Sequence, residues 1–233
     1  MTSPISNERP WIRLSMVAST QDAAANALAE GTQFGGVLAR HQTGGRGRFG
    51  RKWVSEIDES LTMSLVFHDL ANHPRPYLVG MGLAIAAAGA LHCRLRWPND
   101  VMIGSQKVGG ILTEIRDGIP IVGVGINLNQ TSFPDEIDLL ATSLYRRDHR
   151  RRKPEEVAEA ILNRLELVPD PTQWSDLEPA WAIFDDTPGK RYRLPTGEEA
   201  IAIGIGSGGE LECMVNGESR MVLAADALMP PLV

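Results

Sequence analysis

The chain has 233 residues, of which 43% are hydrophobic and 22% are charged, and its formal net charge is −6. This length allows one sizeable core, or one core with a small appended domain. The acidic balance argues against a general nucleic-acid binder, because such proteins are usually basic overall.

The cysteines and the N-terminal segment bear on the compartment. Cys93 and Cys213 lie far apart, among apolar neighbours and without a CxxC spacing, so buried free thiols in a reducing compartment are expected. Residues 1–10 are polar and lack the apolar core of a signal peptide. The apolar run at 78–91 is too short to span a bilayer. We therefore expect a cytoplasmic protein that does not contact a membrane.

The N-terminal half predicts strands interleaved with helices. Residues 11–17 alternate as in a strand, and Ser19 with Asp22 indicates a capping box. This box begins an alanine-rich helix that ends at Gly31. Further strands are expected at 36–39, at 61–67 and at 95–103, the last interrupted by Pro98, with a buried helix at 78–92.

The second half predicts a change of architecture near residue 188. Strands at 107–115 and 119–127 are joined through Asp117-Gly118, and a helix starts at Pro154. Together these elements predict an α+β domain at 1–187, with a mixed sheet flanked by helices. Short strands with frequent turns predict a small β-barrel at 188–233, at residues 190–194, 200–205, 211–215 and 218–223.

The segment 44–53, Gly-Gly-Arg-Gly-Arg-Phe-Gly-Arg-Lys-Trp, places four cations among four glycines. Glycine lets a backbone approach a ligand closely, and arginine presents a rigid fork that matches phosphate and carboxylate oxygens. The mixture favours a loop that closes over an anion. It disfavours a helix, because an interior glycine costs about 1 kcal/mol relative to alanine. From this segment alone, a solvated basic turn and a nucleic-acid patch stay open as alternatives.

Three later segments carry candidate chemistry. Residues 96–100, Arg-Trp-Pro-Asn-Asp, contain an arginine suited to a phosphate and a carboxylate suited to Mg²⁺. Residues 107–110 put a lysine beside two glycines, and residues 123–129 put glycines within a strand, which marks close approach of a ligand or of another backbone. Each segment alone is a weak signal, because such a lysine element is more often a tight strand entry and such a glycine strand is more often a bulge.

Together, in this order and spacing, the segments resemble the motifs of the biotin protein ligases. The resemblance covers residues 19 to about 144, and the C-terminal strands fit the SH3-like domain of that family. The family motifs GRGRxGRxW, KWPND, KxxGIL, GIGINxN and ATSL correspond to residues 45–53, 96–100, 107–112, 123–129 and 141–144. Gln21 stands where the family usually has asparagine, and Arg96 where it usually has lysine.

The resemblance implies a two-step reaction with biotin, ATP and Mg²⁺. Biotin and ATP give biotinyl-5′-AMP and pyrophosphate, and a lysine of a biotin carboxyl carrier protein then displaces AMP. Catalytic roles are implied for Arg48 and Lys107, and a Mg²⁺ contact for Asp100. Biotin binding is implied for Ser19, Thr20, Gln21, Gln42, Arg46, Gly47, Arg48, Lys107 and Gly110. Binding of ATP or the adenylate is implied for Arg48, Arg51, Trp53, Arg96, Asn99, Lys107 and Asn127.

Electrostatics agrees with such a reaction. The biotin carboxylate and the ATP α-phosphate are both anions, so cations at their junction stabilise the transition state. The alternatives are a lipoate or octanoate ligase of the same fold, and a non-catalytic biotin sensor or repressor. No room for a winged helix precedes Trp11, so we expect a short ligase that does not bind DNA. The resemblance also allows a homodimer, since members often pair through the catalytic sheet.

Two further patterns have simple interpretations. The basic run at 146–153 is typical of a solvated linker before a helix, and steering of an acidic carrier domain is the alternative. The five histidines show no metal-ligand spacing, so no transition-metal site is expected.

Overall fold

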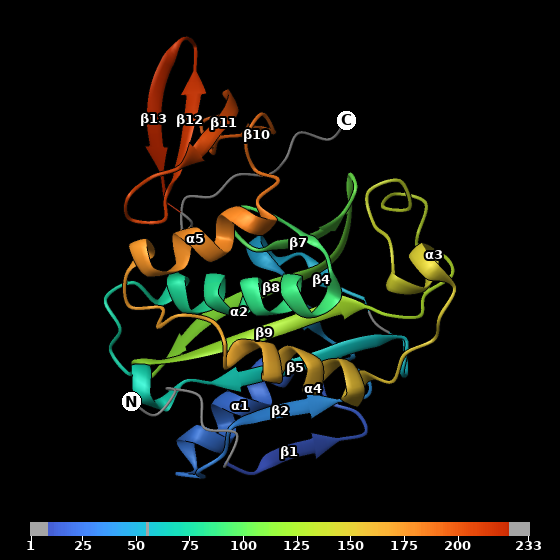
Figure 1. The fold of residues 1–233 in the computed structure, drawn as a ribbon. Helices are drawn as coiled ribbons and strands as arrows, with labels where there is room; N and C mark the ends of the chain where they lie inside the picture. Colours follow the sequence, from blue (N-terminus) through green and yellow to red (C-terminus); the bar gives the residue numbers. More distant parts are fainter. Residues whose placement is uncertain (1–8, 55, 224–233) are drawn as a thin grey trace.

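The computed structural model of the chain describes residues 9–54 and 56–223. Residues 1–8 and 224–233, which the two predicted domains include, lie outside the described part. The main element is a seven-stranded mixed sheet in the order β1-β2-β5-β9-β8-β7-β6 (Figure 1). The pair β1–β2 is parallel, and the other neighbours are antiparallel. The strands are β1 (Trp11–Leu14), β2 (Gly36–Ala39), β5 (Ser60–Val66), β6 (Arg94–Arg96), β7 (Asp100–Ile103), β8 (Gln106–Arg116) and β9 (Ile119–Asn127).

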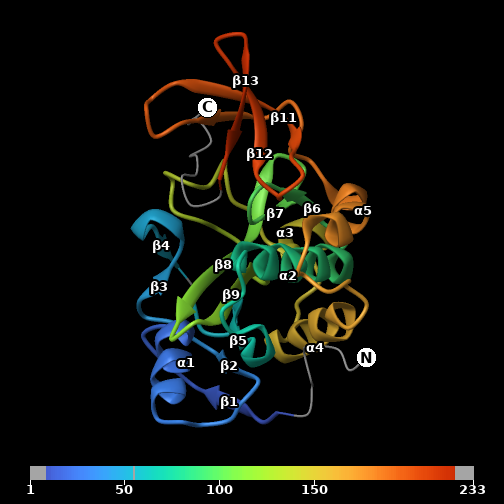
Figure 2. The ribbon, with the colours of Figure 1, turned by 90° about the vertical axis from the view of Figure 1, so that its left-hand side faces the viewer.

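Helices lie on both sides of this sheet. Helix α1 packs against β2, β5 and β9, whereas α2 packs against β8 and β9. Helices α4 and α5 pack against α2. Figure 2 shows α1 on one side of the strands, and α2, α4 and α5 on the other. No helix within residues 9–54 and 56–223 is long and apolar enough to cross a membrane. The α-helices are α1 (Thr20–Ala29), α2 (Pro76–Leu91), α3 (Leu144–Asp148), α4 (Pro154–Leu165) and α5 (Trp174–Phe184); the 3-10 turns are η1 (Arg48–Gly50) and η2 (His68–Leu70).

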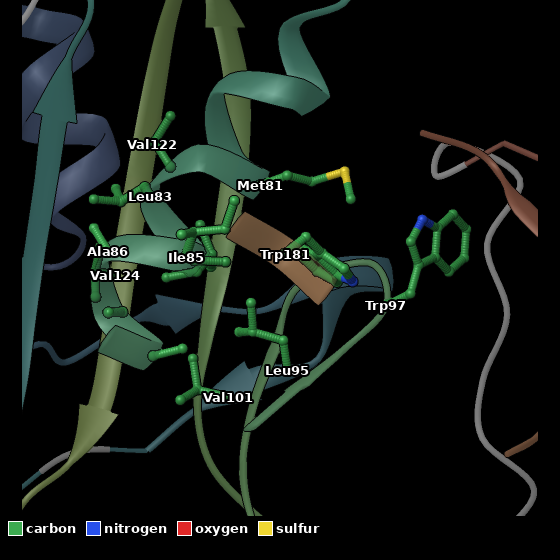
Figure 3. Close-up of a cluster of buried hydrophobic side chains, with 14 of the residues drawn as sticks. Met81, Leu83, Ile85, Ala86, Leu95, Trp97, Val101, Val122, Val124 and Trp181 are labelled. Carbon is green, nitrogen blue, oxygen red and sulfur yellow. The ribbon is translucent and has the colours of Figure 1, made fainter. Parts of the chain in front are cut away.

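Alternation along the central strands separates the core from the opposite face. Successive side chains of a strand point to opposite faces of the sheet. Val122, Val124 and Ile126 of β9 all belong to the main core cluster with α2, and in Figure 3 Val122 and Val124 lie beside Leu83 and Ala86 of α2. The alternate positions of β9 face α1 instead, so this face is available for the predicted site.

The turn and helix signals of the middle of the chain are confirmed. Strands β8 and β9 meet through Asp117 and Gly118, whose φ angles of 49° and 78° lie in the left-handed region. Pro154 is the first residue of α4, where its missing N–H costs no helical hydrogen bond. Helix α2 is buried on nearly every side, as the apolar run at 78–92 predicts.

The segment at 95–103 differs from its prediction. We expected one strand interrupted by Pro98, but the chain reverses there and forms two antiparallel strands, β6 and β7. The reversal lies at Trp97-Pro98, whose peptide bond is cis. Helix α5 was also absent from the sequence prediction, because Pro179 interrupts its helical pattern.

The C-terminal part forms a second, four-stranded antiparallel sheet in the order β10-β11-β12-β13. Each of the four predicted strands is present, and Asn216-Gly217 joins β12 to β13 with both φ angles positive. The described structure thus establishes a small antiparallel sheet at this end of the chain. Its strands are β10 (Arg191–Arg193), β11 (Glu199–Ile205), β12 (Leu211–Val215) and β13 (Glu218–Val222).

The basic run at 146–153 is only in part the solvated linker that its composition predicts, because several of its residues are exposed and others are hydrogen-bonded. Arg146 donates to Asp138 at 2.7 Å, and Arg147 donates to the carbonyl of Leu91 at 2.8 Å. Arg152 forms a fork with Asp148. This part of the run is therefore fixed on the protein surface by specific hydrogen bonds.

Candidate active site

The predicted site segments meet on the α1 face of β8 and β9. Two glycines of β9 leave the space for this meeting, because a side chain would crowd a neighbour at Gly123 and overlap one at Gly125. A Cβ at Gly123 would lie 3.3 Å from the amide of Gln21, and a Cβ at Gly125 would lie 2.7 Å from the indole of Trp53. The glycines predicted to mark close approach therefore receive side chains from α1 and from the basic segment.

Helix α1 starts at the site, but not by the predicted capping box. Ser19 is the N-cap residue and is buried, yet its side chain makes no capping hydrogen bond. Instead, Gln42 Oε1 accepts from the backbone N–H of Thr20 at 2.7 Å and from Thr20 Oγ1 at 3.0 Å. Ser64 Oγ donates to the same Thr20 hydroxyl at 2.8 Å. A distant side chain thus satisfies the N–H of the first helical residue, which has no partner within the helix.

Gln21 is held between α1 and the sheet. Its side-chain Nε2 donates to the carbonyl of Leu112 at 3.0 Å, and the residue is only 5% exposed. Its Oε1 is buried and accepts no hydrogen bond from the described residues. An unpaired buried acceptor costs about 1–3 kcal/mol, so a ligand N–H at this position would be favoured.

The glycine-rich basic segment folds as a β-hairpin, which we call the basic hairpin (residues 45–53). Its strands β3 (Gly45–Arg46) and β4 (Lys52–Trp53) pair antiparallel, and η1 forms the tip. At the tip, Gly50 has a φ of 69°, as glycine permits, but Phe49 also lies in the left-handed region at 59°. The backbone N–H of Gly47 closes the tip by donating to the carbonyl of Arg51 at 2.7 Å.

The predicted catalytic arginine lies at this tip. The Arg48 guanidinium lies 5.0 Å from the centroid of the Phe49 ring. Burial lowers the pKa of Arg48 from its ordinary value, and the charge of Asp100 opposes that lowering. The positive charge is thus kept in a partly desolvated place, where its attraction for an anion is strengthened. Arg51 contributes a second positive charge nearby.

Arg46 takes part in ion pairs at the base of the basic hairpin. Its Nη1 and Nη2 donate to the two carboxylate oxygens of Asp22 at 2.5 and 2.7 Å. Nη2 also lies 3.5 Å from Glu114 Oε1, and the other oxygen of Glu114 accepts from Arg116 at 2.7 Å. The hydrogen bond from Arg46 lowers the pKa of the Asp22 carboxyl. The first arginine of the motif therefore faces carboxylates.

Lys107 has a fixed backbone and a side chain with a charged partner. Its Nζ donates to Asp100 Oδ1 at 2.5 Å, and its ammonium lies over Gly110, 3.1 Å from where a Cβ would be. Its backbone N–H donates to Leu140, and its carbonyl accepts from Thr142. The segment at 140–142, which overlaps the motif at 141–144, therefore anchors the main chain of this lysine.

The donor set does not by itself fit the predicted Mg²⁺ contact. Asp100 is a single carboxylate, and it already accepts a hydrogen bond from Lys107. Across the described ranges 9–54 and 56–223, no group of three or more His, Cys, Asp or Glu side chains is placed to hold a metal ion. We therefore derive no step of the chemistry through a protein-held metal.

The two predicted asparagines have structural partners. Asn99 donates through Nδ2 to the carbonyl of Ile111, and its own carbonyl accepts from the backbone of Ile111. Asn127, at the end of β9, donates to the carbonyl of Thr142 at 3.0 Å and is 6% exposed. Both amides hold the loops beside Lys107, so a contact of either with ATP stays a prediction.

Arg96 and Trp97 connect the site to the C-terminal sheet. Arg96 Nη2 donates to Asp186 at 3.3 Å, in the segment that leads into β10. Trp97 is 1% exposed, and its Nε1 donates to the carbonyl of Gly209 at 2.9 Å. Its backbone N–H donates to Thr187 Oγ1, and its carbonyl accepts from the Tyr192 hydroxyl, both at 3.0 Å. An ATP contact for Arg96 stays a prediction.

Sequence reasoning missed several residues that build the site. Ser64 is one of three hydroxyl residues that alternate with apolar residues in β5, and this alternation was a usable signal. Asp22 was noticed only as part of a capping box. Glu114, Asp186 and Thr187 gave no signal, because their partners lie 68 to 90 positions away in the chain.

Comparison with known proteins agrees with this geometry. The sequence model of the Biotin/lipoate A/B protein ligase family matches residues 16–130. The biotin–[acetyl-CoA-carboxylase] ligase of Mycobacterium tuberculosis is 32% identical over 241 residues, covering 94% of this chain and 89% of that protein. The bifunctional ligase/repressor BirA of Bacillus spizizenii is 39% identical over 146 residues. That match covers 55% of this chain and 44% of the longer relative, so the chain spans less than half of that protein.

Solved structures extend the likeness to nearly the whole chain. The biotin protein ligase from Aquifex aeolicus in complex with biotin and ATP has a TM-score of 0.70 and 26% identity, covering 95% of this chain and 99% of that one. The Leishmania major biotin protein ligase in complex with biotinyl-5-AMP has a TM-score of 0.61 and 26% identity, covering 92% and 99%. The mixed sheet with its flanking helices is thus the biotin/lipoate ligase-like fold. The chain belongs to the biotin protein ligases of the Biotin/lipoate A/B protein ligase family.

Proposed function

We propose that this chain is an ATP-dependent biotin protein ligase. It activates biotin as biotinyl-5′-AMP and transfers the biotinyl group to a lysine of a biotin carboxyl carrier protein. Family membership supports this function, as does the name of the M. tuberculosis relative, a ligase that acts on acetyl-CoA carboxylase. The Aquifex neighbour was solved with biotin and ATP, the two small substrates of the proposed reaction.

The observation that carries the proposal is the buried, unpaired Oε1 of Gln21. A cyclic urea such as the head of biotin offers N–H donors of the kind that this acceptor needs. Ser19 and Thr20 lie on the same helix start and are buried beside it. We therefore assign the start of α1 to the head of biotin, with Gln42 as the side chain that holds this helix start in place.

The first step joins two anions. A carboxylate oxygen of biotin attacks the α-phosphorus of ATP, the bond from that phosphorus to the bridging oxygen breaks, and pyrophosphate leaves with the electron pair. Arg48 and Lys107 stabilise the charge that builds up on the phosphoryl oxygens. Lys107 exchanges its contact with Asp100 for the incoming phosphate, while its backbone stays fixed by residues 140 and 142. No protein nucleophile is needed.

The second step transfers the biotinyl group. The neutral amine of a carrier lysine attacks the carbonyl carbon of the mixed anhydride. The C–O bond to phosphate breaks, AMP leaves, and the nitrogen loses a proton as the amide forms. The basic hairpin covers the adenylate between the two steps and protects the anhydride from water. Arg51 and Trp53 belong to this cover.

The proposal also covers the domains of the chain, its location in the cell and its partners. We assign residues 1–187 to the catalytic domain and 188–233 to an SH3-like barrel, supported by the antiparallel sheet of β10–β13. A cytoplasmic location is supported by two buried free cysteines, of which Cys93 has a pKa raised to about 11 by burial. A carrier protein is the macromolecular substrate, and pairing of two copies through the catalytic sheet is the assembly to test.

Isotope exchange between pyrophosphate and ATP tests the function directly. We expect exchange that depends on biotin and not on lipoate, and a carrier domain whose mass rises by one biotinyl group. Exchange with lipoate alone would identify a lipoate ligase of the same family. Biotin binding without exchange or carrier labelling would leave only a sensor.

A further inference from the structure

Backbone and side-chain contacts join the basic hairpin to the rest of the molecule. Its base is tied by backbone hydrogen bonds, in which the N–H groups of Thr43 and Gly44 donate to Val17 and Ala18 at 3.0 and 2.8 Å. Its tip is closed by bonds within itself. Between base and tip, Trp53 lies over Gly125 on one strand, and Arg46 on the other strand contacts Asp22 and Glu114. These two side chains therefore help to set the orientation of the tip.

The contacts of Arg46 form a row of alternating charges. Asp22, Arg46, Glu114 and Arg116 follow one another, with donor–acceptor distances of 2.7 Å from Arg46 Nη2 to Asp22 Oδ1, 3.5 Å to Glu114 Oε1, and 2.7 Å from Arg116 to Glu114. The row joins three elements: the first turn of α1, strand β3 and strand β8. The two-pronged contact with Asp22 fixes the direction of the guanidinium as well as its distance.

The position of Asp22 in the sequence indicates what this row of charged residues does. Asp22 directly follows Gln21, the residue assigned to the head of biotin, and Arg46 lies two positions before Arg48. A single ion pair thus connects the biotin end of the site with the arginine of the adenylation step. We propose that Arg46 is a positioning residue that Asp22 and Glu114 hold so that the hairpin presents Arg48 to the reacting phosphate. This proposal rests on the proposed function and replaces the ligand contact that the sequence implied for Arg46.

The pair is suited to orienting a loop and not to holding the fold. The side chains of Arg46 and Asp22 are 35% and 46% exposed, and exposed pairs contribute little to stability. Asp22→Asn should therefore leave the melting temperature nearly unchanged. It should lower kcat of biotin-dependent exchange by about tenfold, because small misplacements of catalytic groups are costly. The KM for biotin should change by less than about twofold, since Gln21 keeps its contacts.

The matched control is Asp69→Asn, which removes an equivalent carboxylate from the pair with Arg9, a contact of 3.2 Å outside the site. This variant should exchange at the wild-type rate, and Asp22→Glu should recover part of the loss. Raising the salt concentration should shrink the difference between wild type and Asp22→Asn, because salt screens exposed charges. In addition, hydrogen exchange of the unliganded protein should be faster at residues 45–53 in Asp22→Asn.

A double-mutant cycle separates positioning from direct contact. If Arg46 acts through Asp22, Arg46→Ala combined with Asp22→Asn should lose no more activity than the worse single variant. Additive losses, or wild-type kcat in Asp22→Asn, would overturn the inference. Failure of the wild-type protein to exchange would instead reject the proposed function. The hydrogen-exchange comparison would still decide whether Asp22 orders the hairpin.

Discussion

The basic hairpin at 45–53 is held by charged side chains that are partly in solvent, whereas the turn at Trp97 is held by neutral groups that are buried. Arg46 and Asp22 are 35% and 46% exposed. Trp97 and Tyr192 are 1% and 2% exposed and share a hydrogen bond of 3.0 Å. Exposed ion pairs contribute at most about 1 kcal/mol, but leaving a buried polar group unpaired costs about 1–3 kcal/mol. The ion pair of Arg46 therefore contributes less to stability than the buried hydrogen bonds of Trp97.

The largest expected effect is on the turn. Trp97→Ala removes a buried ring and the hydrogen bond to Gly209, and should lower the free energy of unfolding by about 3–5 kcal/mol. Denaturant titration measures this loss. Asp22→Asn, on the hairpin side, should change it by less than about 1 kcal/mol. Equal losses in the two variants would remove the distinction between the regions.

The next largest effect is expected on the reaction rate, from a substitution in the basic hairpin. Arg48→Gly should slow biotin-dependent exchange by tens to hundreds of fold, because a charge-assisted hydrogen bond contributes about 1.5–3 kcal/mol. It should also release biotinyl-AMP, which then labels bystander proteins. Lys52→Gly, a cation-to-glycine change in the same hairpin, is the control and should label only the carrier. Retention of the adenylate by Arg48→Gly at the wild-type level would speak against a covering hairpin.

A smaller effect is expected where the hairpin rests on the sheet. In Gly125→Ala the new Cβ would lie 2.7 Å from the indole of Trp53, so the ring must shift. We expect roughly a tenfold slower exchange reaction, with an overpacking cost of about 1–3 kcal/mol. Gly204→Ala, which meets no atom within 4 Å, is the matched control. If both variants catalyse the exchange reaction at the same rate, the packing of Trp53 against β9 does not contribute to catalysis.

The smallest effect comes from the arginine-rich segment and depends on pH. The hydrogen bond from Arg152 lowers the pKa of Asp148 from 3.8 to about 2. Because the pKa is lowered on folding, the stabilisation is present above pH 3.8 and is lost as the pH falls toward 2. Asp148→Asn should be less stable than wild type by under about 1 kcal/mol near neutral pH. Denaturation curves of the two proteins should converge in acid, and a constant gap would contradict the assignment.

Local signals in the sequence predicted most of the strands and helices correctly. Asp117-Gly118 and Asn216-Gly217 are turns because two adjacent residues accept positive φ, a property that needs no distant partner. Pro154 likewise marks a helix start by its own geometry. The prediction failed at the start of α1, where Ser19 makes no capping hydrogen bond and Gln42, 22 positions from Thr20, accepts from the first N–H of the helix.

The sequence predicted which segments form the candidate site, but it did not predict the ion pairs between their side chains. The motifs identified which segments meet, and Gly123 and Gly125 correctly marked close approach. The partners of the charged residues were not predictable, because Arg46 and Arg96 face carboxylates that no motif contains, at Asp22 and Asp186. The left-handed φ of Phe49 also has no signal in a residue that rarely adopts it.

The Trp97 turn has a consequence for synthesis on the ribosome. The residues assigned to biotin and ATP lie between positions 19 and 127, but the partners of Trp97 are Thr187, Tyr192 and Gly209. A nascent chain therefore carries the whole ligand-binding sequence long before it can complete the Trp97 turn. During that interval the N–H, carbonyl and indole N–H of Trp97 lack the partners they have in the finished fold. The residues assigned to the ligands are thus synthesised before the partners that complete the Trp97 turn.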